Sequence, residues 1–156
     1  MATNAIGLNQ KKAEDLAKHL NDLLANYSIF YQNVRGFHWN IKGDKFFVLH
    51  VKFEELYNDL IIKIDEIAER ILTLGYAPEH NYSSYNEVST LKETKEVNDG
   101  DKCVKTIVES LKTIIGLQRT LLDESEAAGD EGTNAIMSDY IRDQEKLVWM
   151  YSAYLT

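Results

Sequence analysis

Two histidines and several carboxylates are spaced so that they can hold a metal ion. His50 lies four residues before Glu54, and Asp65 lies four residues before Glu69. Residues four apart share one face of a helix, so each pair can converge on one ion. His38 adds a further imidazole upstream. Imidazoles and carboxylates with open coordination positions suit non-haem iron; the alternative is that these groups are solvated helix charges, as most carboxylates are.

The distance between the two pairs indicates that one chain cannot complete such a site. His50 and Asp65 are 15 residues apart. On one helix this separation is about 22 Å along the axis and about 60° around it, so the two side chains face roughly the same way from opposite ends. An antiparallel copy of the helix across a two-fold axis would bring the ends together. The spacing therefore predicts a site that needs at least a dimer.

A di-iron site inside a single four-helix bundle has a different signature. Such a site uses Glu-x-x-His motifs on two of its helices. None of the four histidines has a glutamate three residues before it, so a site within one bundle is not predicted.

Four helices are predicted to carry these residues. Proline occurs once and glycine eight times, so long stretches are free of helix breakers. Gly43 and Asp44 separate the first two helices, and residues 127–132 separate the last two, with Thr133 predicted as an N-cap. Apolar residues recur at steps of three and four over residues 16–34, 53–74, 104–121 and 136–155.

A polar stretch at about residues 76–100 joins the two helical pairs. A connection of this length matches an all-α four-helix bundle in which one long crossover links two antiparallel hairpins. Because a long loop without structure is uncommon, a short extra helix is predicted at residues 86–93. There is no internal repeat, and residues 1–156 are predicted to form one domain.

The composition excludes several classes of protein. A net charge of −8 works against binding to nucleic acid, which depends on lysine and arginine. It suits a protein that attracts cations. No apolar run is long enough to cross a membrane. The start of the chain lacks the pattern of a signal peptide, and the lone Cys103 cannot form an internal disulfide, so a cytoplasmic location is expected.

Two stretches of the sequence resemble the Dps family, the small ferritin-like proteins of starved or oxidatively stressed bacteria and archaea. The first runs from His38 to His50 and is followed by Glu54; the second runs from Ile64 to Pro78. Together they match both signatures of the family. The helix order, the crossover and the aromatic fourth helix agree as well, so the resemblance covers nearly the whole chain and implies a ferritin-like fold.

The resemblance also implies ligands, reaction and partners. His38 and His50 of one subunit would bind iron together with Asp65 and Glu69 of its two-fold partner, and Glu54 would be a further acidic ligand or would support one. The family forms hollow dodecamers, oxidises Fe(II) preferably with hydrogen peroxide, and deposits ferric mineral inside; di-iron sites are therefore expected. No organic cofactor is implied.

Each of the two tryptophans has a predicted role. Trp39, beside His38, is either an electron donor when the iron supply is mismatched or a packing residue at the subunit interface. Trp149 is predicted to lie in the core.

Three acids near the start of the fourth helix stand at positions that the resemblance assigns to pores of the assembly. Asp130, Glu131 and Asp139 stand where family members line three-fold pores with carboxylates, which would draw in Fe(II). The alternative is that Asp130 and Glu131 complement the positive end of the helix.

Binding to DNA is expected to be weak or absent. Family members that bind DNA usually do so through a mobile lysine-rich tail, and the first twelve residues contain only Lys11 and Lys12 as basic groups. The competing hypotheses are a DNA-compacting protein with secondary iron chemistry, and a bundle whose metal site takes zinc or serves no reaction.

Overall fold

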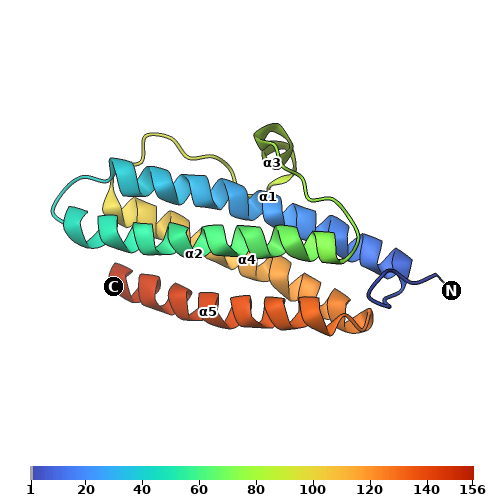
Figure 1. Cartoon of the computed structure of the whole chain (residues 1–156). Helices are drawn as coiled ribbons and strands as arrows, with labels where there is room; N and C mark the ends of the chain where they lie inside the picture. The colour runs from blue at the N-terminus through green and yellow to red at the C-terminus, as the bar shows by residue number, and fades with distance from the viewer. Residues whose placement is uncertain (1) are drawn as a thin grey trace.

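The computed structural model describes residues 2–156 of the protein, and within them it contains helices and two isolated β-bridges but no strand. The all-α four-helix bundle is therefore confirmed, with a fifth, short helix in the crossover (Figure 1). None of the helices in this range is long and apolar enough to cross a membrane. The helices are α1 (Gln10–Asn40), α2 (Phe46–Thr73), α3 (Tyr82–Val88), α4 (Gly100–Ala127) and α5 (Glu131–Leu155).

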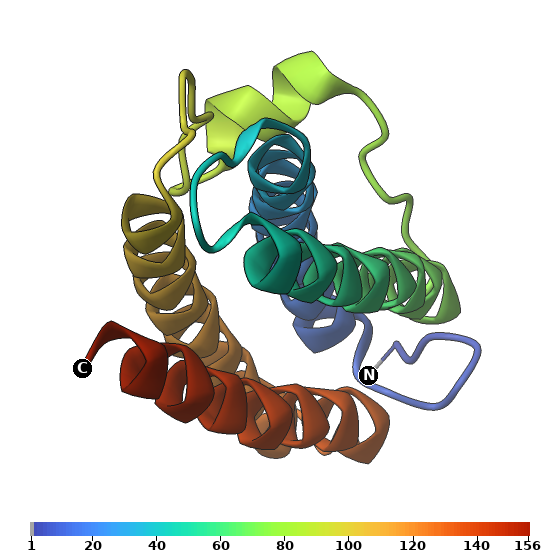
Figure 2. The same ribbon diagram turned by 90° about the vertical axis from the view of Figure 1, so that its left-hand side faces the viewer.

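The long helices form two antiparallel hairpins, α1 with α2 and α4 with α5, and α1 also contacts α4. Figure 2, which looks down the bundle, shows these four helices around a common core, with α3 outside them beside α1. The hairpin turns use glycines in the left-handed region: Gly43 has a φ of 108° and Gly129 a φ of 69°. Residues with a side chain rarely adopt this conformation, so these two positions allow the chain to reverse there.

Helix α1 is buried on more than one side. All eight residues from Leu23 to Phe30 are buried, because α2 and α4 cover one side of this helix and the crossover with α3 covers another. Two of its buried residues, Asn26 and Asn33, are polar. A buried amide needs hydrogen-bond partners, and the crossover supplies them.

Asparagines of α1 fasten the crossover to the bundle. The Asn26 Oδ1 atom accepts hydrogen bonds from the backbone N–H groups of Thr90 and Leu91, both at 3.0 Å. The Asn33 Oδ1 atom accepts from the backbone N–H of Thr94 at 3.0 Å, and its Nδ2 atom donates to the Lys92 carbonyl at 2.9 Å. The crossover after α3 is therefore ordered without a helix of its own.

Three local predictions differ from the structure. The short helix lies at Tyr82–Val88 rather than at residues 86–93, because the Asn81 side chain caps its start and the chain from Ser89 onward is extended and bound by α1. The N-cap of α5 is Asp130 rather than Thr133, since the Asp130 carboxylate accepts from the Thr133 backbone N–H. Trp149 is 66% exposed rather than buried in the core.

Candidate metal centre

His38 and His50 meet where the α1–α2 hairpin turns. The Nδ1 atom of His38 lies 2.5 Å from the carbonyl oxygen of His50, and the Nδ1 atom of His50 lies 2.7 Å from the carbonyl oxygen of His38. The His38 carbonyl is near the end of α1, where carbonyls lack a partner in the helix. A carbonyl only accepts, so both Nδ1 atoms carry the hydrogen. In its neutral form each ring then has a free lone pair on Nε2, the form in which histidine binds metals.

The two imidazoles are stacked. Their ring centroids are 3.8 Å apart and their planes differ by 11°. Phe46 stacks on His50 at 4.7 Å, and Tyr57 packs its ring edge-to-face with His38 at 5.3 Å. A metal bound to Nε2 lies about 2 Å away and in the plane of that ring, and the two planes are too nearly parallel to share such a point. The pair can therefore serve two ions but not one.

Glu54 lies beside the His38 ring. One of its carboxylate oxygens, Oε1, is 3.7 Å from the His38 Nε2 atom. This separation is too long for a hydrogen bond, but it leaves room for an ion bonded at about 2 Å to each atom. His38 is buried, whereas Glu54 is half exposed, so the space between them opens to the surface.

Asp65 and Glu69 lie on the same continuous helix as His50, and the structure does not bring them to the histidine pair. Both are exposed, and neither side chain has a hydrogen bond or ion pair within the described chain. Among residues 2–156, no group of three or more histidines, cysteines or acids is arranged to hold a metal ion. A single chain thus contains the two halves of the predicted site, but does not assemble them.

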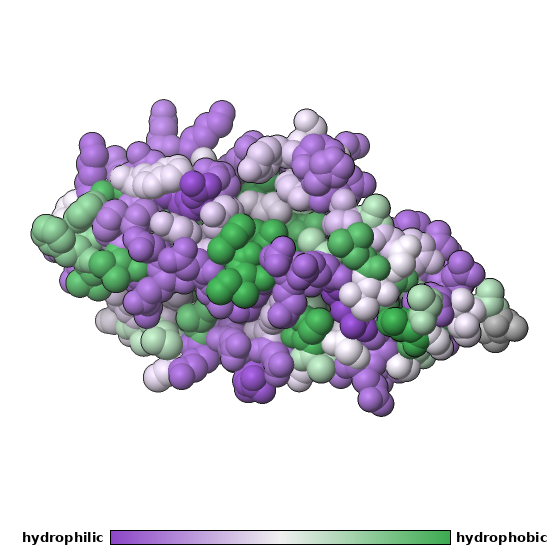
Figure 3. Space-filling view, viewed as in Figure 1, coloured by the Kyte–Doolittle hydropathy of each residue, from purple (hydrophilic) through white to green (hydrophobic). Residues whose placement is uncertain are grey.

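The face of α2 that carries Asp65 and Glu69 is otherwise largely apolar. Successive residues turn by about 100°, which places five exposed apolar residues within about 60° of Asp65. Figure 3 shows apolar patches on the side of the molecule along which α2 runs. Exposed apolar patches of this kind mark interaction surfaces. The residues of this apolar stripe are Phe47, Val51, Ile61, Ile62 and Leu72.

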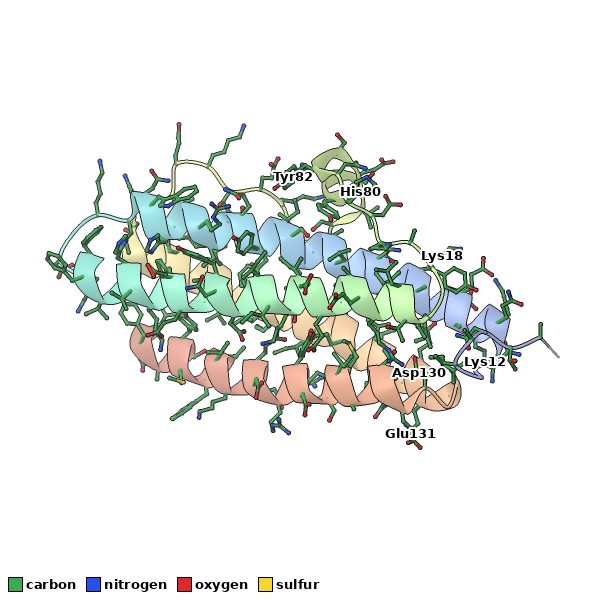
Figure 4. The ribbon with its side chains drawn as sticks, in the orientation of Figure 1. Lys12, Lys18, His80, Tyr82, Asp130 and Glu131 are labelled. Carbon is green, nitrogen blue, oxygen red and sulfur yellow. The ribbon has the colours of Figure 1, made fainter. Side chains whose placement is uncertain are left out.

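The three predicted pore acids have different environments. Asp130 is only 1% exposed, and its carboxylate is 2.6 Å from the Arg70 guanidinium. Glu131 and Asp139 are exposed, and Asp139 lies 3.2 Å from Arg142. Figure 4 shows the Glu131 side chain pointing away from the bundle, unlike that of Asp130. Asp130 therefore caps α5 and links it to α2, whereas Glu131 and Asp139 face solvent in the single chain.

Trp39 is next to His38 in sequence but faces the other way. It is 55% exposed, and the guanidinium carbon of Arg35 lies 4.8 Å from its ring centre. A cation over the ring opposes the loss of an electron from the indole. This environment favours the packing role of Trp39 over electron donation.

Phe46 and Tyr57 are contacts of the histidine pair that sequence reasoning missed. For Tyr57 a signal existed, because it follows His50 and Glu54 at helical spacing and so shares their face. For Phe46 there was none, since an apolar residue at the start of a helix has no metal-binding signature.

Comparisons with known proteins agree with this architecture. The family model of the ferritin-like domain matches residues 17–156. The "DNA protection during starvation protein" of Porphyromonas gingivalis is 44% identical over 96% of this chain and 94% of its own length. An uncharacterised protein of Haemophilus influenzae is 51% identical over 98% of this chain and 96% of its own.

Among solved structures, that of the Dps protein from Vibrio cholerae superposes with a TM-score of 0.99 at 52% identity, covering 100% of this chain and 98% of that one. It is described as a member of the ferritin-like diiron-carboxylate proteins. The Dps structure from Staphylococcus aureus gives a TM-score of 0.88 at 32% identity, over 99% of both chains.

Proposed function

The chain belongs to the Dps family of ferritin-like proteins, and we propose that it oxidises Fe(II) with hydrogen peroxide or oxygen at sites that two subunits share. Family and fold support a role in iron storage and in protection of the cell. The observation that carries the finer proposal is the division of ligands on α2: His50 lies at one end and Asp65 and Glu69 at the other, with no partner for either acid among residues 2–156.

An antiparallel dimer through α2 would assemble the shared site. In a two-fold dimer the same surface of both copies is in contact, so the apolar stripe would pack against itself. Asp65 and Glu69 of each copy would then approach the histidine pair of the other. Each dimer would hold two such sites, and we propose the family's hollow dodecamer as the complete assembly.

The chemistry follows from the ligands. Neutral imidazoles with free Nε2 atoms bind Fe(II) without adding charge, whereas carboxylates favour the higher charge of Fe(III). The stacked rings would serve two separate irons, and Glu54 would share the ion held by His38. Two Fe(II), one hydrogen peroxide and two protons give two Fe(III) and two waters, so each iron supplies one electron and no hydroxyl radical is released.

Mixed assemblies test the shared site. We expect assemblies of His50→Ala chains alone, or of Asp65→Asn chains alone, to lose Fe(II) oxidation. Co-expression of both chains should restore about a quarter of the wild-type rate, because half of randomly formed pairs are mixed and each mixed pair has one intact site. His80→Ala, at an exposed position, is the control and should keep full activity. Mixed assemblies as inactive as their parents would contradict the proposal.

Iron would reach the interior through pores lined by exposed acids, for which Glu131 and Asp139 are the proposed candidates. Asp130 would set the position of the α5 start through Arg70. Charge reversal in a Glu131→Lys variant should slow mineral formation more at low salt than at high salt, because screening weakens the field of the pore.

Compaction of DNA is the competing function, which would need basic groups that are free to reach the phosphates. The Asn4 side chain donates to the Leu74 carbonyl at 3.2 Å, and Lys12 donates to the Ala127 carbonyl at 3.4 Å, so this segment is tied to the bundle. Figure 4 shows Lys12 and Lys18 well apart along α1. We expect no retention of DNA in a gel-shift titration at physiological salt; retention at modest protein concentration would favour the competing function.

A further inference from the structure

The middle of the bundle contains a closed ring of hydrogen bonds. The Tyr27 hydroxyl donates to Gln118 Oε1 at 2.6 Å, Gln118 Nε2 donates to Gln144 Oε1 at 2.7 Å, and Gln144 Nε2 donates to the Tyr27 hydroxyl at 2.6 Å. All three residues are at most 1% exposed. They come from α1, α4 and α5. These interior positions therefore carry neutral groups that are hydrogen-bonded to one another.

On the α2 side of this ring lies a buried lysine. Lys63 is 7% exposed, and its ammonium lies 2.7 Å from both carboxylate oxygens of Asp59. The same ammonium is 5.1 Å from the centre of the Tyr140 ring. The Tyr140 hydroxyl donates to Glu66 Oε1 at 2.6 Å. Burial and Glu66 both raise the pKa of Tyr140 above its ordinary value, so its phenol keeps the proton that it donates.

These contacts place the ammonium against one carboxylate, Asp59, and beside the ring of Tyr140, whose hydroxyl binds a second carboxylate, Glu66. Asp59 and Glu66 are seven residues apart on α2 and share one face, and the Tyr140 oxygen is bonded to Glu66. Two carboxylates and a phenol oxygen are ligands for a hard cation. In this chain the cation bound to Asp59 is the side chain of Lys63, which is covalently attached and cannot leave.

Stability alone does not explain a buried lysine here. Taking an ammonium out of water is costly, and replacing a buried ion pair by apolar groups is often neutral or stabilising. The consequence of a charged residue at this place is therefore its effect on other cations rather than on stability. A divalent cation would meet Coulomb repulsion from the ammonium and would have to break its two short bonds to Asp59.

We propose that Lys63 acts as a built-in cation that keeps Fe(II) and other divalent ions out of the bundle. It is a residue that determines where metal binds: with the ammonium in place, the Asp59 carboxylate is paired and is not available to iron. Without it, Asp59 and Glu66 form a second cation site on the α5 side of the same helix. This inference does not depend on the iron oxidation proposed above.

Binding of Tb³⁺, a hard ion that prefers oxygen ligands, tests the inference. The parent protein carries Asp65→Asn and Glu69→Gln, which remove the two carboxylate ligands of the outward face. In this parent, Lys63→Ala and Lys63→Gln should each bind one further Tb³⁺ per chain, with emission excited through tyrosine. Adding Asp59→Asn should abolish the gain.

Two controls separate the effect of the ammonium from a general loss of positive charge. Lys63→Arg keeps a cation at the site and should bind no further ion. Lys52→Ala removes a lysine that pairs with Glu55 at 3.1 Å on the exposed part of the same helix, and should leave the stoichiometry unchanged. Helix content and assembly size are measured for every variant. Equal Tb³⁺ stoichiometry for the parent and for folded Lys63→Ala or Lys63→Gln, or a gain with Lys63→Arg, would overturn the inference.

Discussion

His38 and His50 hold each other in place: each imidazole donates from Nδ1 to the backbone carbonyl of the other residue. Neither ring can turn without breaking its own bond and disturbing the stack at 3.8 Å. The α1–α2 turn, rather than either helix alone, therefore presents both free Nε2 atoms. This mutual support makes the two histidines one unit.

Single and double replacements of this pair should be strongly non-additive. Loss of a group that orients a metal ligand costs about 10- to 100-fold in metal affinity or activity. We expect His38→Ala and His50→Ala each to slow Fe(II) oxidation by at least about tenfold for this reason. The double variant should be little worse than either single one, because each replacement already removes a ligand and frees the other ring. Initial rates of ferric absorbance measure this, and multiplying effects would contradict it.

The ring of Tyr27, Gln118 and Gln144 should contribute strongly to stability. In a Gln144→Leu variant the Gln118 amide loses its acceptor and the Tyr27 hydroxyl loses a donor. A buried polar group left without a partner costs about 1–3 kcal/mol, so we expect a clear fall in the melting temperature at fixed protein concentration. Gln32→Leu, at an exposed position on α1, is the matched control. Similar melting temperatures for the two variants would show that the ring is dispensable.

The crossover should become accessible when its asparagine anchor is removed. Asn26→Ala deletes the acceptor for the backbone N–H groups of Thr90 and Leu91. These amides should then exchange hydrogen faster and limited proteolysis should cut nearby, while the bundle helices keep their protection. Asn86→Ala, an exposed asparagine of α3, serves as the control. Unchanged exchange at residues 89–91 in the Asn26 variant would argue against the anchor.

Cys103 should be inert in the native protein. It is fully buried, and burial, with Asp99 adding to the effect, raises the pKa of its thiol to about 11. A raised pKa keeps the thiol protonated at neutral and mildly alkaline pH, and the thiolate is the reactive form. A thiol reagent at pH 8 should therefore label it only after denaturation.

The Cys103 thiol also makes the stability of the protein depend on pH. Because the folded pKa lies above the unfolded one, the contribution of this group to stability is complete below the unfolded pKa, near 8.5, and decreases as the pH rises toward 11. As a control, the native double variant Cys103→Ala, Lys102→Cys should react rapidly with the same thiol reagent, because position 102 is exposed. Rapid labelling of native Cys103 would contradict this prediction.

The fold was largely predictable because its main signals are local. Apolar residues at helical spacing indicated the four long helices, and the length of residues 76–100 indicated the crossover. The prediction that two subunits share the site rests on helical rise alone, since His50 and Asp65 are separated along one helix whatever surrounds it. The predictions that failed concern particular contacts: the bounds of α3 depend on Asn26 and on the Asn81 cap, and no periodicity encodes them.

Tertiary structure alone decided which polar groups are buried together. Nothing in the sequence indicates that Lys63 or Asp130 is buried, yet both are buried and paired, Asp130 with Arg70 sixty residues away. The mutual bonds of His38 and His50 also depend on carbonyls whose positions the α1–α2 turn sets. Helix periodicity and rise are properties of neighbouring residues, so the sequence determined the helices and the separation of His50 from Asp65 along α2. Hydrogen bonds between distant residues form only after the helices have packed, so only the tertiary structure determined the partners of these buried polar side chains.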